Sequence, residues 1–208
     1  GEVKMNKQTD WEIVLDGDSL LLHNMNDSLS RTDYFRLYGG INHWLDCQDD
    51  NFFFDSLYFD GEDDSYAVWQ TAYELIDLLN GAITLYRKEF YKIRPKSVNL
   101  KNREVKYCTN DKLQGLLGRP NISAEEHHIQ LESSLREFKP LGWLVLATER
   151  KDVYMILKLL NLENGWVTYY KILETIESCC RENEFSIDID HTARKCHLIN
   201  QCQFWPTS

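Results

Sequence analysis

One amphipathic stretch, residues 64–87, constrains the fold of this chain more than any other feature. Its apolar residues recur at steps of three and four, which places them on one side of an α-helix in a stripe wide enough to be buried. Asp63, Asp64 and Ser65 stand at its start, where their oxygens can accept from the free N–H groups of the first turn. Gly81 costs a helix about 1 kcal/mol relative to Ala, so we expect another element to pack closely against it. The stripe consists of Val68, Ala72, Leu75, Ile76, Leu79, Ala82, Ile83 and Tyr86.

The composition is that of a globular protein of one large domain or two small ones. The chain has 208 residues, of which 43% are hydrophobic, which is ample for a core. No apolar run approaches the roughly 20 residues of a membrane span, and residues 1–11 lack the apolar block of a signal peptide. The six cysteines form no CxxC pair, which favours reduced thiols. We therefore expect a cytoplasmic protein with no membrane partner.

Charge is distributed unevenly along the chain. The formal net charge is −10, and residues 37–86 contain ten acidic residues but no Lys or Arg. Residues 87–106 have the opposite balance, with more basic than acidic residues. Two interpretations are open. In the first, the acidic and basic blocks neutralise each other in the fold or are simply solvated; in the second, the basic block faces an anionic partner. We expect several of Lys92, Arg94, Lys101 and Arg103 to lie within salt-bridge reach of the acidic block. The acidic balance disfavours nucleic acid as a partner.

The first half of the chain carries strand signals around the predicted helix. Residues 11–23 predict two short strands joined by a turn at Asp16-Gly17, and residues 24–32 predict a loop. Pro95 predicts an edge strand or a break, because proline cannot donate to a ladder. The other predicted strands cover residues 34–37, 90–100 and 104–108.

The second half has a helical pattern. Ser123 and Glu126 form a capping box at the start of a helix that ends at Lys139-Pro140. Its apolar stripe contains His128, whereas the adjacent His127 points about 100° away, so we expect His127 to face solvent. Further helices are predicted over residues 153–160, 166–180 and 191–200. The inward stripe of the second of these consists of Trp166, Tyr169, Tyr170, Leu173, Ile176 and Cys180.

These patterns predict an α+β protein. A small, mostly antiparallel sheet packs on the central helix at residues 64–87, and a helical C-terminal half follows. A boundary near Asn110 separates a β-rich part, residues 1–110, from a helical part, residues 111–208, although the two can share one continuous core.

A candidate ligand site combines two segments of the C-terminal half. Trp166 and Tyr170 are one helical turn apart, so their rings can form one wall, which Lys171 can flank. His191 and Arg194 are also one turn apart and can bind a phosphate or act on it by general acid–base chemistry. Apolar walls with a few convergent polar groups are typical of binding sites. The alternative is that both rings are buried in a helical core and His191 only caps a helix.

No stronger chemical motif is present. The chain lacks a GxSxG nucleophile motif and a GxGxxG dinucleotide loop. Cys196, His197 and Cys202 lack the spacing and fourth ligand of a zinc site. We therefore expect no metal and no cofactor, and favour a non-catalytic binding or regulatory module for a protein or small-molecule partner over an enzyme. The alternative is a phosphate-directed enzyme, for example an RNA-cleaving one, that uses His191 and Arg194.

Three short segments resemble a family of uncharacterised bacterial proteins. Residues 78–82 read LLNGA, residues 166–172 read WVTYYKI and residues 191–193 read HTA. The same segments follow in this order in that family. The resemblance implies a bacterial protein. It implies no activity, because the family is uncharacterised. The chain departs from the family pattern after Ala193.

Overall fold

The computed structural model describes residues 11–29, 34–39, 51–87, 89–100, 103–105, 118, 120, 122–162 and 165–184. The chain divides into two compact units, residues 1–162 and 163–208. The first unit contains an antiparallel sheet and helices α1 to α5, and the second contains α6 (Trp166–Glu182). The predicted α+β class with a helical C-terminal half is confirmed. The predicted boundary near Asn110 lies outside the described residues and stays a prediction.

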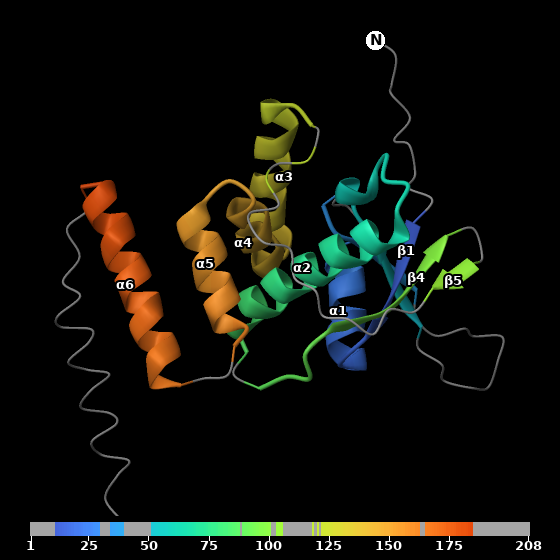
Figure 1. Cartoon of the computed structure of the whole chain (residues 1–208), viewed down its shortest axis with the longest axis horizontal. Coiled ribbons are helices and arrows are strands. Elements are labelled where there is room, and N and C mark those ends of the chain that lie inside the picture. The colour runs from blue at the N-terminus through green and yellow to red at the C-terminus, as the bar shows by residue number, and fades with distance from the viewer. Residues whose placement is uncertain are drawn as a thin grey trace, which may run out of the picture. The chain divides into compact units, whose positions relative to one another are not determined.

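The sheet has five strands in the order β2-β3-β1-β4-β5, and every neighbouring pair is antiparallel. Figure 1 labels β1, β4 and β5. In the central strand β1, Ile13 lies opposite both Phe54 and Val98, and all three are fully buried. Because side chains alternate along a strand, Val14 belongs to the other face of the sheet. The strands are β1 (Trp11–Asp16), β2 (Arg36–Gly39), β3 (Phe52–Asp55), β4 (Arg94–Leu100) and β5 (Arg103–Val105).

Pro95 interrupts the ladder between β1 and β4, as predicted. Val14 pairs with Ser97 and Leu15 pairs with Pro95, so Lys96 is an extra residue of β4 at this point. A bulge of this kind suits a proline, which has no N–H to donate. β5 pairs only with residues 98–100 of β4, so the half of β4 that contains Pro95 has no β5 partner.

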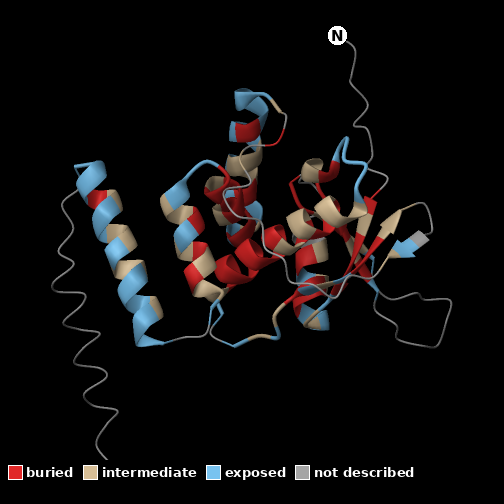
Figure 2. Cartoon of the chain, viewed as in Figure 1, coloured by how far each residue is buried: buried red, intermediate tan, exposed pale blue. Residues whose placement is uncertain are grey.

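The predicted central helix is α2 (Ser65–Thr84). The Asp64 carboxylate caps it by accepting from the Tyr66 amide at 3.0 Å. Figure 2 shows α2 as mostly buried, and residues 74–83 are buried without interruption, Leu79 among them. An amphipathic helix would bury only one side. α2 is covered on more than one side because β4 packs against it together with α4 (Lys139–Ala147) and α5 (Lys151–Leu160).

Gly81 is a point of close backbone contact between α2 and α5. A Cβ atom at Gly81 would lie 2.0 Å from the carbonyl oxygen of Leu157 in α5. Only a residue without a side chain fits this contact. The close packing predicted at Gly81 is therefore confirmed.

Residues 19–29 form helix α1 (Ser19–Leu29), so the prediction of a strand and then a loop over this stretch is wrong. The Asp18 carboxylate accepts from the Leu21 amide at 3.0 Å, which is the contact of a helix N-cap rather than of a hairpin turn. Leu21, Leu22 and Met25 follow helical spacing and are buried in the core. This burial favours the helix.

Helix α3 (Ala124–Glu137) begins where its capping box predicts, with the complete box of Ser123 and Glu126. It ends at Phe138, and α4 follows at once with Pro140 in its first turn, where a missing N–H costs nothing. A short 3₁₀ helix, η1 (Leu57–Phe59), lies between β3 and α2. None of the helices within the described ranges is long and apolar enough to cross a membrane.

Candidate functional site

The site predicted from sequence is described only in part. Trp166, Tyr170 and Lys171 lie on α6 in the second unit. Trp166 is 53% exposed and Tyr170 63% exposed, so an inward stripe of aromatic rings is not confirmed. His191 and Arg194 lie outside the described residues. Their convergence with the α6 wall therefore stays a prediction.

The two adjacent histidines take the opposite positions to those predicted. His127 is buried at 4% exposure, whereas the His128 side chain is 69% exposed. The buried side of α3 is shifted by one residue relative to the predicted stripe, because Ser134 is buried and Leu135 is exposed. The spacing of apolar residues does not show which side of α3 is buried, because two of the buried residues, His127 and Ser134, are polar.

Tertiary contacts explain why an imidazole is buried there. A hydrogen bond joins His127 Nδ1 to the hydroxyl of Tyr34, which is fully buried. Nε2 of the same ring lies 3.2 Å from the Glu149 carboxylate. This geometry favours a proton on Nε2, so that Nδ1 accepts from the Tyr34 hydroxyl. Because Tyr34 has no exposed surface, the chain of three groups holds α3 against its neighbours rather than meeting a substrate.

A second buried polar cluster joins α2 to α5. The Glu74 carboxylate is fully buried, accepts from the Tyr154 hydroxyl at 2.5 Å and lies 2.8 Å from Lys158 Nζ. The same ammonium lies 3.1 Å from the Asp77 carboxylate. Burial, together with the hydrogen bond to Glu74, raises the pKa of Tyr154. Two buried acids are thus neutralised in part by one lysine.

This cluster identifies the cation that pairs with two residues of the acidic block. Glu74 and Asp77 belong to the acidic block, yet their cation is Lys158 of α5 and not a residue of the basic block. Within the described part of the chain, neither Lys92 nor Arg94 forms an ion pair with an acid. The side chains of Lys101 and Arg103 lie outside the described set.

Lys92 and Arg94 instead line a cavity of about 390 Å³ between α2, the start of β4 and the end of α5. We call it the helix-edge pocket. The side chain of Asn80 fixes one wall, because it donates to the Ile93 carbonyl at 2.8 Å and accepts from the Ile93 amide at 3.0 Å. The buried Ile93 is thereby tied to α2, with Lys92 and Arg94 on either side of it. The lining residues are Trp69, Tyr73, Ile76, Asp77, Asn80, Lys92, Ile93, Arg94, Pro95, Asn161 and Leu162.

The balance of charge in the helix-edge pocket is positive. Its one acid, Asp77, is held by Lys158. The Lys92 ammonium donates to the backbone carbonyl of Asn161, and the Arg94 guanidinium lies 5.9 Å from the Tyr91 ring centre. Neither contact neutralises a charge. An anion is therefore the complementary ligand.

The aromatic wall of the helix-edge pocket comes from α2. Trp69 and Tyr73 are one turn apart, with ring centres 6.3 Å from each other. Burial raises the pKa of the Tyr73 phenol, and the nearby Asp77 carboxylate adds to the effect while Arg94 and Lys158 oppose it. Tyr73 therefore stays neutral at physiological pH and can donate a hydrogen bond to an anion.

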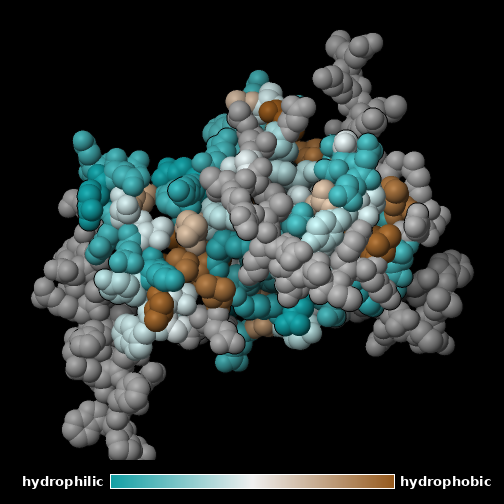
Figure 3. Space-filling view, viewed as in Figure 1, coloured by the Kyte–Doolittle hydropathy of each residue, from teal (hydrophilic) through white to brown (hydrophobic). Residues whose placement is uncertain are grey.

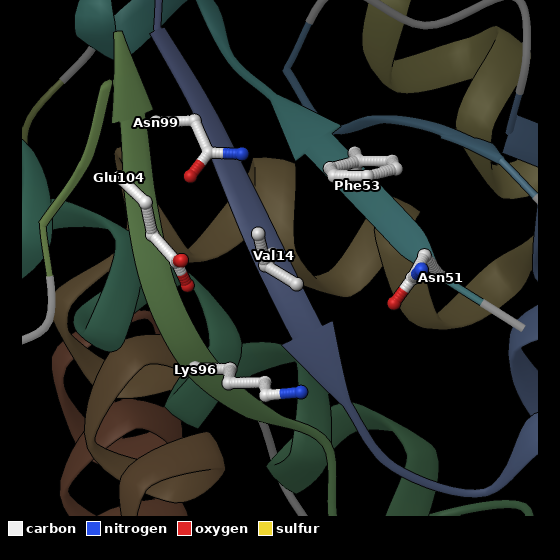
Figure 4. A pocket seen from close by; sticks show the side chains of 6 residues that line it. All are labelled: Val14, Asn51, Phe53, Lys96, Asn99 and Glu104. Carbon is white, nitrogen blue, oxygen red and sulfur yellow. The ribbon is translucent and has the colours of Figure 1, made fainter. Parts of the chain in front are cut away.

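A second cavity, of about 320 Å³, lies on the face of the sheet that bears Val14. We call it the sheet-face pocket. Figure 4 shows polar side chains from β4, β5 and the start of β3 around Val14 and the Phe53 ring. Its lining residues are Val14, Asn51, Phe53, Lys96, Asn99 and Glu104.

Other site chemistry is sparse in the described ranges. No group of three or more His, Cys, Asp or Glu residues is placed to hold a metal ion there. Cys179 and Cys180 of α6 form no disulfide bond. The view in Figure 3 shows mostly hydrophilic colours on the described surface, with apolar colours in small patches. Among the residues that the structure describes, these two cavities are therefore the candidates for ligand binding.

Comparison with known proteins adds no relative. No protein-family model matches this chain, and searches of curated proteins and of solved structures also found no match. The case for either pocket therefore rests on its own geometry. The helix-edge pocket could not be found from sequence, because its residues come from three distant segments. In the sequence, the one indication of this pocket was the excess of basic residues over positions 87–106.

Proposed function

We propose that this protein is a non-catalytic binding or regulatory module of a bacterial cytoplasm, and that the helix-edge pocket takes a small anionic ligand. One observation carries the proposal: Lys92 and Arg94 line the same cavity, and neither forms an ion pair with an acid of the described chain. The volume of about 390 Å³ is in the range of small-molecule sites.

The contacts around the pocket favour an anion that also carries a planar group. Arg94 and Lys92 supply charge, and Arg94 can bind a carboxylate or phosphate through two parallel hydrogen bonds. Tyr73 and the buried Trp69 supply aromatic surface from α2. The buried side-chain oxygen of Asn161 has no hydrogen-bond partner among the described atoms, so a ligand hydroxyl or amine would complete it.

The rigid frame of the pocket also favours binding over catalysis. Asn80 fixes the Ile93 backbone, and Lys158 holds Asp77 in place. A preformed site binds without the cost of ordering its own side chains. No described group stands beside Lys92 and Arg94 as a nucleophile with an adjacent base. The alternative enzyme, acting through His191 and Arg194, gains no support because both residues lie outside the described chain.

Calorimetric titration with phenyl phosphate tests the proposal, with inorganic phosphate as the comparison. We expect phenyl phosphate to bind more tightly, because its ring can contact Tyr73. Arg94→Met should weaken its affinity about tenfold or more, since a charge-assisted hydrogen bond is lost. Lys96→Met is the matched control: it removes a cation from the same strand at the other pocket.

Three outcomes would contradict the anion pocket. They are no measurable heat with either probe, an unchanged affinity in Arg94→Met, and equal losses in Arg94→Met and Lys96→Met. The last would indicate nonspecific attraction to positive charge. Native mass spectrometry of the purified protein would show whether an anionic compound co-purifies, and Arg94→Met should lose it.

A further inference from the structure

The helix-edge pocket contains an acid that by itself would oppose an anionic ligand. Asp77 of α2 lines the cavity together with Lys92 and Arg94. Asp77 is 7% exposed, and a carboxylate with so little contact with water acts on a nearby charge more strongly than an exposed one, because water screens it less. An isolated Asp77 would repel an anion and would attract the cationic group of a ligand.

Lys158 of α5 prevents both effects. Its ammonium lies 3.1 Å from the Asp77 carboxylate and 2.8 Å from the Glu74 carboxylate. Lys158 is not one of the described residues that line the pocket, so it meets Asp77 from outside the cavity. Tyr154, one turn earlier on α5, donates to Glu74 at 2.5 Å. Two contacts therefore hold this side of α5 against the acids of α2.

The charges of this cluster reach the aromatic wall of the pocket. Burial has the largest effect on the pKa of the Tyr73 phenol and raises it. The Asp77 carboxylate raises this pKa further, whereas Arg94 and Lys158 lower it. Lys158 thus opposes the effect of Asp77 at a residue that a bound ligand would contact.

The total charge around the pocket is positive. Three cations, Lys92, Arg94 and Lys158, stand against two acids, Glu74 and Asp77, which leaves one positive charge. Both acids are held by Lys158. A ligand ammonium would meet Lys92 and Arg94 while Asp77 is already engaged by another ammonium, so it would be repelled. An uncharged donor, such as a hydroxyl, is not repelled in this way.

We propose that Lys158 sets the charge specificity of the helix-edge pocket, so that the pocket binds an aromatic anion without an ammonium group and rejects the corresponding zwitterion. This inference rests on the anion pocket proposed above and narrows its class of ligand. Lys158 is a positioning residue: it touches no ligand and acts through Asp77. Aromatic acids are therefore ligands of this pocket, and aromatic amino acids are not.

Two probes that differ in one group test the specificity. The first, 3-phenylpropionate, is an aromatic acid, and L-phenylalanine is the same acid with an ammonium group on its α-carbon. In calorimetric titration near neutral pH, we expect the protein to bind 3-phenylpropionate about tenfold or more tightly than L-phenylalanine. Without Lys158, Asp77 should repel the carboxylate of both probes and accept from the ammonium of L-phenylalanine. The affinity for 3-phenylpropionate should then fall about tenfold or more, and the preference should disappear.

Variants in a common Glu74→Gln background isolate Asp77, because Lys158→Met alone would also leave Glu74 buried without its cation. Glu74→Gln by itself keeps the pair of Lys158 and Asp77 and should keep the preference. Glu74→Gln/Lys158→Met should lose it, and the further change Asp77→Asn should restore it. A purely structural role of Lys158 would not be repaired by Asp77→Asn. Lys151→Met, which removes a cation from an exposed position of α5, is the matched control and should bind as the wild type does.

Asp77→Asn alone provides a second test, because it leaves no acid without its cation. Lys158 then keeps Glu74 as its partner, and the charge around the pocket becomes more positive. We expect the affinity for 3-phenylpropionate to rise about threefold or more. Circular dichroism and the urea midpoint verify that each variant is folded.

Several results would overturn the role of Lys158. One is that the wild type binds both probes equally well. Another is that folded Glu74→Gln/Lys158→Met keeps the full preference, and a third is that Asp77→Asn gains no affinity for 3-phenylpropionate. In each of these cases, binding of phenyl phosphate that depends on Arg94 would leave the anion pocket itself standing. If the wild type binds neither phenyl phosphate nor 3-phenylpropionate, the anion pocket and the role of Lys158 are both refuted.

Discussion

Gly81→Ala sets two energetic effects of opposite sign against each other. Alanine is favoured over glycine in a helix interior by about 1 kcal/mol, so propensity alone predicts a more stable protein. The structure predicts the reverse. The new Cβ would lie 2.0 Å from the Leu157 carbonyl oxygen, whereas ordinary contacts begin at 3.4 Å.

The size of the expected loss in stability follows from the displacement of α5 that the new Cβ atom requires. α5 would have to retreat by about 1.4 Å, the difference between those two distances. The obstacle is backbone, so no side-chain rotation relieves it. Overpacking costs about 1–3 kcal/mol, and a backbone obstacle belongs at the upper end of that range. After the gain in helix propensity, we expect a net loss of about 2 kcal/mol in the free energy of unfolding.

Urea denaturation followed by circular dichroism measures this loss. Gly142→Ala in α4 is the matched control, because the two atoms nearest its new Cβ are side-chain atoms of Leu135, at 2.4 and 2.6 Å, and the nearest backbone atom, the Leu135 Cα, is farther away at 3.0 Å. The Leu135 residue is 40% exposed, so its side chain has room to move. We expect Gly142→Ala to cost less than Gly81→Ala. If Gly81→Ala leaves the free energy of unfolding unchanged or increases it, the close contact between α2 and α5 is refuted.

The remaining predictions concern the same core. Leu79→Ala should cost about 2–5 kcal/mol, since Leu79 is fully buried; an unchanged melting temperature would mean that α2 is peripheral. Lys158→Met leaves Glu74 buried without its cation and should cost about 3–5 kcal/mol, part of which Glu74→Gln should restore in the double variant; full stability of Lys158→Met would contradict the pairing. The pKa of Tyr154 is raised in the folded protein, so its contribution to stability is complete below the unfolded pKa of about 10. It is lost as pH rises through the folded value. The urea midpoint should therefore fall above about pH 10, and fall less steeply in Tyr154→Phe; equal slopes would show that Tyr154 is not responsible.

Local patterns in the sequence were enough to determine the main elements. The three- and four-residue spacing of residues 64–87 predicted α2, and the Ser123–Glu126 capping box predicted the start of α3. Pro95 predicted the break in the ladder of β4. Each of these features depends on backbone hydrogen bonds and side chains within a few residues, so neighbouring residues in the chain are sufficient to encode them.

The tertiary structure alone decided which faces are buried and which charges meet. The sequence around Leu21 fits a strand or a helix, and packing of Leu21, Leu22 and Met25 into the core selects the helix. His127 is buried rather than His128 because Tyr34, 93 residues away in the chain, supplies its hydrogen bond.

Contacts between distant segments also decide which charged groups pair and which residues line the two pockets. Lys158, rather than the basic block, pairs with Glu74 because α5 crosses α2 at Gly81. The helix-edge pocket joins residues of α2, β4 and α5, and the sheet-face pocket joins four strands. Such contacts depend on the distance between elements in space, and a pattern read along one segment contains no information about that distance.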